Sequence, residues 1–217
     1  MIERLDVSDF NFVFTHLNVR SFNKHYIDIE CDSILTSCDL LLLSETQIKE
    51  NSDHISTLNG FKVHFQNDDD KFSSLAVCYK PGITFGIEYS LSGLIVFTIC
   101  KPSFNNASKI KFLFIYRKQD CNTLSDFTYS IHHVLSYCKN IDVILGDLNF
   151  NYFDEIPGHV KDAFLNFDQV VSEPTQISGG LLDQIYINKD VSFSTKSLIK
   201  HIYFSDHDAT VCKFENN

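Results

Sequence analysis

Residues 143–149 read Val-Ile-Leu-Gly-Asp-Leu-Asn, an apolar run that ends in a glycine and a carboxylate–amide pair. A second run, Leu-Leu-Leu-Leu at residues 40–43, is followed two positions later by Glu45. Strands that are apolar on both faces lie inside a sheet that another layer covers on each side. The two runs are therefore expected to be central strands with polar side chains at their ends.

Similar apolar runs, rich in β-branched and aromatic residues, recur along the chain. Together with the central ones they predict strands at 12–19, 40–43, 75–79, 94–100, 110–116, 143–145, 181–187 and 209–214. Apolar residues at helical spacing predict three helices, at 23–37, 123–137 and about 160–167. The economical packing is an α/β sandwich, with two sheets face to face and helices outside.

The size and charge of the chain limit what it can be. With 217 residues, 44% of them hydrophobic, it is expected to form one globular domain over residues 1–217. The formal charge of −10 argues against a broad basic surface for nucleic acid, because phosphate binding draws on clustered Lys and Arg. An enzyme can nevertheless reach phosphate through a divalent cation, and the carboxylates that hold the cation make the chain acidic.

The cysteines and the N-terminal residues indicate an intracellular protein. The seven cysteines are odd in number, form no Cys-x-x-Cys pair and lie mostly in apolar runs, as expected of reduced core thiols. No apolar run approaches the roughly 20 residues of a membrane span, and the N-terminus carries acids rather than the apolar region of a signal peptide. We therefore expect no membrane partner.

Several apolar runs end in polar or acidic residues, which is how a sandwich presents catalytic groups at one rim. These ends are Asn18, Glu45, Tyr116, the pair Asp147 and Asn149, and the pair Asp206 and His207. Asp147 and Asn149 are two positions apart, so in an extended backbone their side chains point the same way. One acid at a strand end is usually a solvated turn residue, but the recurrence of such ends favours a shared site.

The residue types at these ends suit a hard cation. Mg²⁺ binds oxygen ligands, commonly one or two carboxylates together with water and substrate phosphate, so Glu45 and Asp206 would suffice. No thiolate or multi-histidine set offers a zinc alternative, because the adjacent His132 and His133 face different directions on a helix. His16 likewise has no partner at an informative spacing, so a structural or solvated role is expected of it.

Six short blocks, read in order, resemble the endonuclease/exonuclease/phosphatase (DNase I-like) superfamily. They are His16-Leu-Asn-Val, Leu42-Leu-Ser-Glu-Thr, Ile115-Tyr-Arg, Leu145-Gly-Asp-Leu-Asn, Leu182-Asp-Gln-Ile-Tyr and Phe204-Ser-Asp-His, spanning positions 16 to 207. Within the superfamily, Tyr116-Arg117 and Pro174-Thr175 most resemble the apurinic-type endonuclease domain of non-LTR retrotransposons and related mobile elements. The resemblance implies a four-layered α/β sandwich with two mostly antiparallel sheets face to face.

The resemblance also implies a metal site. Glu45 would hold Mg²⁺, or Mn²⁺ in its place, with Asn18 and Asp206 beside it. Where many relatives carry a second acid or amide two residues beyond the asparagine, this chain has Arg20, which puts a second metal-proximal ligand in doubt.

The remaining matched positions are expected to act on the phosphate. Asp147 would orient or deprotonate the attacking water, and Asn149 would position it or touch the phosphate. Asp183 would hydrogen-bond His207 and favour its imidazolium, and Tyr116 would donate to the same phosphate. Further contacts to the substrate are expected from Thr175, Arg117 and Ser205.

The function that the resemblance implies is a Mg²⁺-dependent endonuclease that nicks DNA and leaves a 3′-OH. It would act in the nucleus as a monomer, either free or within a larger mobile-element polyprotein. One alternative is a phosphatase or phosphodiesterase of the same fold that acts on a lipid or a nucleotide. The other is an inactive remnant that binds nucleic acid or protein.

Overall fold

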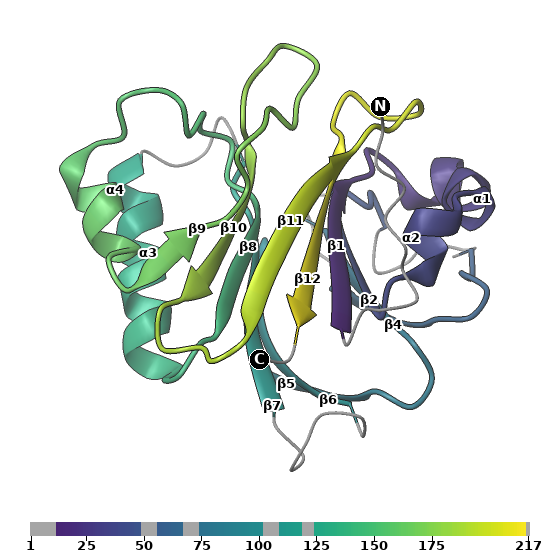
Figure 1. The fold of residues 1–217 in the computed structure, drawn as a ribbon, viewed down its shortest axis with the longest axis horizontal. Helices are drawn as coiled ribbons and strands as arrows, with labels where there is room; N and C mark the ends of the chain where they lie inside the picture. Colours follow the sequence, from purple (N-terminus) through teal and green to yellow (C-terminus); the bar gives the residue numbers. More distant parts are fainter. Residues whose placement is uncertain (1–11, 49–55, 67–73, 102–108, 119–123, 216–217) are drawn as a thin grey trace.

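The described residues fold into two six-stranded sheets that pack face to face between two outer layers of helices (Figure 1). The computed structural model describes residues 12–48, 56–66, 74–101, 109–118 and 124–215. The first sheet has the order β11 (Ser194–Lys200), β12 (Ala209–Glu215), β1 (Phe12–Asn18), β2 (Leu40–Ser44), β4 (Leu75–Tyr79) and β3 (Lys62–Gln66). The second has the order β5 (Thr84–Leu91), β6 (Leu94–Cys100), β7 (Lys109–Tyr116), β8 (Val143–Asp147), β10 (Asp183–Asn188) and β9 (Phe167–Gln169).

The sheets are mostly antiparallel, as predicted. Each contains one parallel pair, β1 with β2 in the first sheet and β7 with β8 in the second. The other pairings between the described strands are antiparallel. The parallel pairs matter for function, because parallel strands bring their carboxyl ends to the same edge of a sheet.

The central strands are buried on both faces, which explains their continuous apolar sequences. In β2, Leu40 and Leu42 belong to the core between the sheets, whereas Leu41 and Leu43 pack in the layer that includes the first helices. β8 alternates in the same way, with Ile144 in a third cluster beneath the later helices. Each fully buried leucine of this kind stabilises the fold by about 1.5–3 kcal/mol.

Helices cover the outer face of each sheet (Figure 1). α1 (Phe22–Cys31) and α2 (Ser33–Ser37) lie over the first sheet, and α3 (Leu124–Tyr137) and α4 (Gly158–Ala163) lie over the second. Between the sheets, the ring of Phe14 meets the ring of Phe112 edge-on, with 5.4 Å between the centroids. The predicted four-layered α/β sandwich is confirmed.

Two of the three predicted helices have different bounds. The helix expected at 23–37 is divided at Asp32, whose backbone is extended and whose carboxylate accepts hydrogen bonds from the amides of Ile34 and Leu35. An aspartate that caps a new helix in this way interrupts the preceding one. The helix expected at about 160–167 ends at Ala163, and Phe167 begins strand β9.

Four of the described strands were not predicted, namely β3, β5, β9 and β11. Much of β5 and β11 is exposed or only partly buried, because both are edge strands of their sheets. An edge strand lacks the continuous apolar run that marks a central strand. The strand expected at 181–187 begins at Asp183.

The six described cysteines are free thiols. Cys38, Cys78, Cys138 and Cys212 are buried as expected. Cys31 is exposed at the end of α1, so the expectation of core thiols is wrong for this residue. Within the described ranges, no helix is both long and apolar enough to span a membrane.

Candidate active site

The strand ends of both sheets meet at one rim. The parallel register pairs Asn18 with Ser44 at the ends of β1 and β2, and Tyr116 with Asp147 at the ends of β7 and β8. The antiparallel neighbour β10 begins at the same level, with Asp183 opposite Asp147. Five strands of two different sheets therefore deliver polar side chains to one place, as the strand-end pattern predicted.

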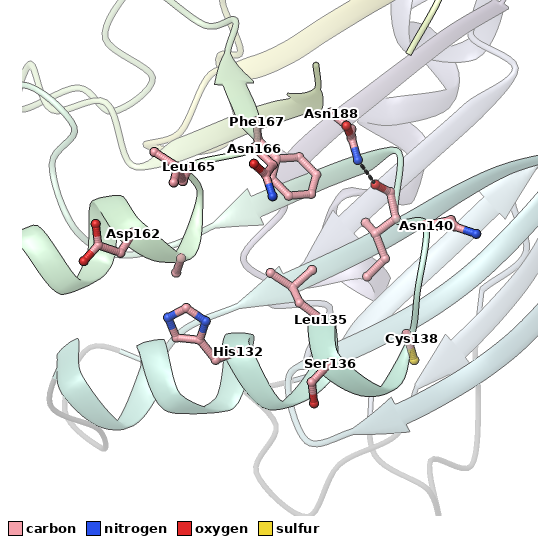
Figure 2. Close-up of a pocket in the computed structure, with 12 residues that line it drawn as sticks. His132, Leu135, Ser136, Cys138, Asn140, Asp162, Leu165, Asn166, Phe167 and Asn188 are labelled. Carbon is pink, nitrogen blue, oxygen red and sulfur yellow. Dashed lines mark hydrogen bonds between the residues drawn. The ribbon is translucent and has the colours of Figure 1, made fainter. Parts of the chain in front are cut away.

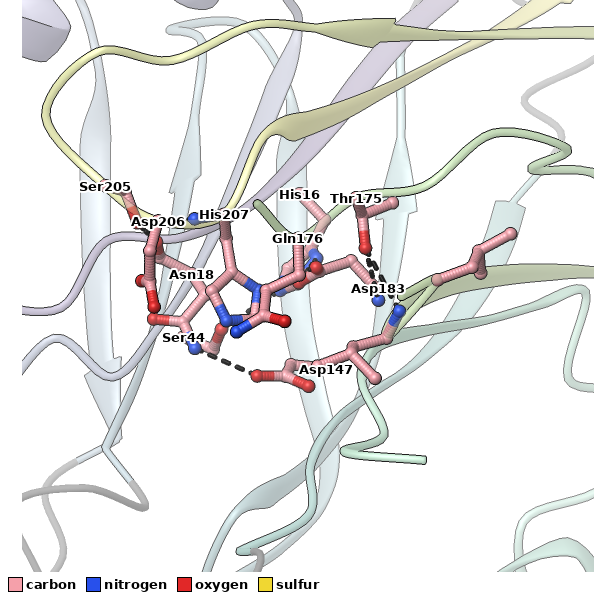
Figure 3. Close-up of polar contacts among 12 residues, drawn as sticks. His16, Asn18, Ser44, Asp147, Thr175, Gln176, Asp183, Ser205, Asp206 and His207 are labelled. Atoms are coloured by element: carbon pink, nitrogen blue, oxygen red, sulfur yellow. Dashed lines mark hydrogen bonds and ion pairs between the residues drawn. The ribbon is translucent and has the colours of Figure 1, made fainter. Parts of the chain in front are cut away.

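The side chain of Asn18 joins the two sheets. Its Nδ2 donates to Oε1 of Glu45 at 2.7 Å. The same nitrogen donates to Oδ2 of Asp147 at 2.9 Å (Figure 3). Asn18 and Asp147 are fully buried, and Glu45 is almost so. Because the amide donates both N–H groups to carboxylates, the cation ligand of this side chain can only be its Oδ1, which also accepts the backbone N–H of Arg20 at 3.3 Å.

The phenol of Tyr116 donates to the same Glu45 oxygen at 3.1 Å. Burial raises the pKa of Tyr116, and the neighbouring carboxylates of Glu45 and Asp147 raise it further. The phenol therefore stays protonated at physiological pH and serves as a hydrogen-bond donor.

Asp147 is held by a sharp backbone turn. Its Oδ1 accepts the amide N–H of Asn149 at 3.0 Å, and the preceding Gly146 has a φ of 140°. A Cβ at Gly146 would lie 1.8 Å from the carbonyl oxygen of Ile115, so only glycine fits beside β7. Burial, followed by the nearby charge of Asp183, raises the pKa of Asp147 to about 7. This carboxylate can therefore exchange a proton near neutral pH.

Asp183 and His207 form a buried pair. Nδ1 of His207 lies 2.8 Å from Oδ2 of Asp183 (Figure 3). Burial alone would lower the pKa of His207, but the charge and the hydrogen bond of Asp183 outweigh it and raise the pKa to about 9. The imidazole is thus an imidazolium at neutral pH, with Nδ1–H directed to Asp183 and Nε2–H as its other donor.

The predicted substrate contacts Thr175 and Ser205 make structural hydrogen bonds. Oγ1 of Thr175 accepts the amides of Leu182 and Asp183 at 3.1 and 3.0 Å, and the side chain is fully buried. Oγ of Ser205 donates to the carbonyl oxygen of Asn18 at 2.7 Å. Both side chains hold the loops that carry the catalytic candidates, and contact of either with the substrate stays a prediction.

Arg117 is turned inwards. Its Nε donates to the carbonyl oxygen of Leu148 at 2.6 Å, and its terminal nitrogen donates to that of Asn149. In return, Nδ2 of Asn149 donates to the carbonyl oxygen of Arg117 at 2.6 Å. With 8% of its surface exposed, the arginine supports the turn after β8, and a contact with substrate stays a prediction.

Of the three predicted metal ligands, two contact each other and the third is paired with an arginine. Glu45 and Asn18 are in direct contact, but Asp206 is ion-paired with Arg20, whose Nε lies 2.7 Å from its Oδ1. The structure also groups ligand atoms of Asp147, Asp183 and His207 within 4.8 Å of one another. His207 is a poor ligand here, because one nitrogen is bound to Asp183 and the ring is protonated at neutral pH.

The residues present nevertheless fit a hard divalent cation. Glu45, Asn18, Asp147 and Asp183 offer oxygen donors of the kind that Mg²⁺ prefers. Burial is the main cause of the raised pKa of Asp147, and the charge of Asp183 raises this pKa further, so the two buried carboxylates repel each other. A cation bound at this place would offset their repulsion.

His16, for which a structural or solvated role was expected, is buried and has two polar neighbours. Its Nδ1 lies 3.5 Å from Oδ1 of Asp183, and its Nε2 lies 3.1 Å from Oγ of Ser44. Burial lowers the pKa of His16 to about 4, so this imidazole is neutral. The period of two along β1 puts His16 on the same face as Asn18, and this signal could have identified it.

Two cavities lie away from this rim. One of about 420 Å³ is lined by residues of α3 and α4, including His132 and Asp162, by the segments that follow these helices, and by Asn188 at the end of β10 (Figure 2). The other, of about 640 Å³, lies beside α4 and is lined by Tyr152, Phe164 and other side chains. Neither is lined by a predicted site residue.

Known structures share this fold. The endonuclease domain of TRAS1, a telomere-specific non-LTR retrotransposon, superposes with a TM-score of 0.74 and 13% identity, over 94% of this chain and 97% of that one. The AP endonuclease LMAP from Leishmania major has a TM-score of 0.69 and 14% identity, over 99% and 92% of the two chains. An endonuclease/exonuclease/phosphatase family protein from Leptotrichia buccalis has a TM-score of 0.65 and 15% identity, over 94% and 99%.

The amino-acid sequence alone matches no known family or curated protein. No family model matches the chain. No curated protein matches it either. The similarity therefore rests on three-dimensional structure, and the chain has the DNase I-like fold of the endonuclease/exonuclease/phosphatase proteins.

Proposed function

We propose that this protein is a Mg²⁺-dependent phosphodiesterase that nicks DNA and leaves a 3′-OH, in the manner of a retroelement endonuclease. The observation that carries the proposal is the convergence of Asp147, the Asp183–His207 pair and the Asn18–Glu45 pair at one rim. The six sequence blocks and the fold shared with the TRAS1 endonuclease domain support DNA as the substrate.

The chain's own residues can place water and charge around a phosphodiester. Asp147, with a pKa near neutrality, accepts a proton from the attacking water. The imidazolium of His207 donates from Nε2 to a non-bridging phosphate oxygen, and Asp183 orients the ring from the other side. The phenol of Tyr116, which donates to Glu45 in this structure, is a second donor for a phosphate oxygen.

A magnesium ion would be held by Glu45 and Asn18. When bound, it supplies positive charge that polarises the phosphate and stabilises the leaving oxygen. Asn18 also keeps Asp147 and Glu45 at a set separation, because one amide donates to both. Phosphoryl transfer requires little covalent work from a protein, so positioning and charge of this kind suffice.

The test is nicking of supercoiled plasmid in Mg²⁺, followed by polymerase extension from the nick to detect a 3′-OH. Asp147→Asn and His207→Ala are expected to abolish nicking, whereas His133→Ala, an exposed histidine on α3, should leave it unchanged. Release of phosphate from soluble monoesters without nicking would identify a phosphatase of the same fold. The absence of any turnover, together with DNA binding, would identify an inactive remnant.

A further inference from the structure

Arg20 and Asp206 form an ion pair at the exposed edge of the candidate site. Nε of Arg20 lies 2.7 Å from Oδ1 of Asp206, with 49% and 33% of the two side chains exposed. The other carboxylates of the site, Glu45, Asp147 and Asp183, are all buried. Asp206 is therefore the carboxylate most open to a cation from solution, and a guanidinium already neutralises it.

The position of Arg20 is set by the backbone around it. Arg20 has a φ of 50° and the next residue, Ser21, a φ of 143°, both of which are uncommon for residues other than glycine. The amide of Arg20 lies 3.3 Å from Oδ1 of Asn18. Strained conformations of this kind persist where the surroundings over-determine them, often at ligand sites.

The partner Asp206 is held against the same strand end. Oγ of the neighbouring Ser205 donates to the carbonyl oxygen of Asn18 at 2.7 Å and accepts the amide of His207 at 3.2 Å. The amide of Ile177 donates to the carbonyl oxygen of Asp206 at 3.0 Å. The loop after β1 and the tripeptide 205–207 are thus fastened to each other, and the ion pair joins two anchored segments.

We propose that the Arg20 guanidinium takes the place of a second divalent cation, so that the site binds a single ion at Glu45 and Asn18. This inference rests on the proposed phosphodiesterase function. A positive charge 2.7 Å from Asp206 repels a dication that would use this carboxylate as a ligand. The half-exposed guanidinium instead presents N–H donors to a phosphate of the substrate, for which its planar fork is well suited.

Counting bound ions tests the first part without substrate or turnover. Mn²⁺ is titrated into the protein, and free Mn²⁺ is followed by electron paramagnetic resonance. The wild type is expected to bind one ion. Arg20→Asn is expected to bind two ions, whereas Arg20→Lys, which keeps the positive charge, should bind one. Adding Asp206→Asn to Arg20→Asn should return the count to one, which separates the Asp206 site from adventitious ions on an acidic chain.

The second part is tested with the salt dependence of KM for plasmid nicking. Arg20→Asn should lose about one unit of the slope of log KM against log salt, and Arg20→Lys should keep it. Two ions on the wild type, or one ion on Arg20→Asn, would overturn the inference even if the protein nicks DNA. One ion on the wild type and two on Arg20→Asn without nicking would uphold the ion count while refuting the proposed function. A failure of every variant to bind an ion would count against both.

Discussion

Asp183 lies at hydrogen-bond distance from His207, with 2.8 Å between Oδ2 and Nδ1, although the two residues are 24 positions apart. The other oxygen of Asp183 faces a second imidazole, that of His16, at 3.5 Å. The carboxylate is fully buried between the two rings, one protonated and one neutral. This arrangement orients His207 towards the rim where Asp147 lies.

Replacing Asp183 with asparagine should lower the kcat of nicking by roughly 10²–10⁴-fold with little change in KM. An amide can still accept a hydrogen bond from His207, but it cannot stabilise the imidazolium. Asp168→Asn, which changes an exposed aspartate on β9, is the matched control. Equal kcat values for the two variants would remove the Asp183–His207 pair from the mechanism.

Nicking by the wild type should decline as the pH rises through about 9, where His207 loses its proton. Since this pKa lies above the ordinary value of 6.5, the ion pair also contributes stability that is fully present below pH 6.5 and is lost as the pH rises through about 9. In Asp183→Asn the alkaline limb should move to lower pH. Profiles of kcat and of the thermal midpoint between pH 6 and about 10 check both statements. An alkaline limb at the same pH in the wild type and in Asp183→Asn would contradict them.

Mg²⁺ should raise the thermal midpoint of the wild type, and EDTA should reverse the effect. A ligand that binds only the folded state stabilises it by about 2.7 kcal/mol at 100 times its dissociation constant. Glu45→Gln should lose most of this gain, because it removes the carboxylate next to Asn18. Scanning calorimetry with and without the ion measures the difference, and an equal gain in the variant would place the ion elsewhere.

Gly146→Ala should destabilise the protein by at least roughly 2–3 kcal/mol and abolish nicking. The new Cβ would lie 1.8 Å from the carbonyl oxygen of Ile115, so β7 and β8 must separate next to Asp147. Gly158→Ala is the control, because a Cβ at the start of α4 meets no heavy atom within 4 Å. The urea midpoints of unfolding of the two variants should differ clearly. Similar midpoints would refute the steric argument.

Thr175→Val should cost roughly 1–3 kcal/mol, because the amides of Leu182 and Asp183 lose their buried acceptor. Thr175→Ser keeps the hydroxyl and should recover most of that stability. Urea unfolding provides the measurement. If Thr175→Val is as stable as the wild type but its KM rises, the residue binds substrate rather than supporting β10.

The central part of the fold could be predicted because both faces of its strands are buried. The runs at 40–43 and 143–145 are apolar at every position, and the structure places alternate residues of each in two different cores. Strands β5 and β11 lie at sheet edges, where partial exposure removes the pattern. The division of the first helix depends on the side chain of Asp32, a local competition that helical spacing does not reveal.

For the candidate site, the sequence by itself determined which residue types end the strands, because acids and amides after apolar runs are visible in one dimension. The resemblance also predicted the contact between Asp183 and His207, whereas tertiary structure alone decided three further contacts. It turned Arg117 inwards, placed His16 behind Asp183 and set Arg20 against Asp206. A contact between residues as far apart in the sequence as 20 and 206 depends on how two sheets and their loops are brought together. A local pattern of side chains does not reveal which distant residues will meet.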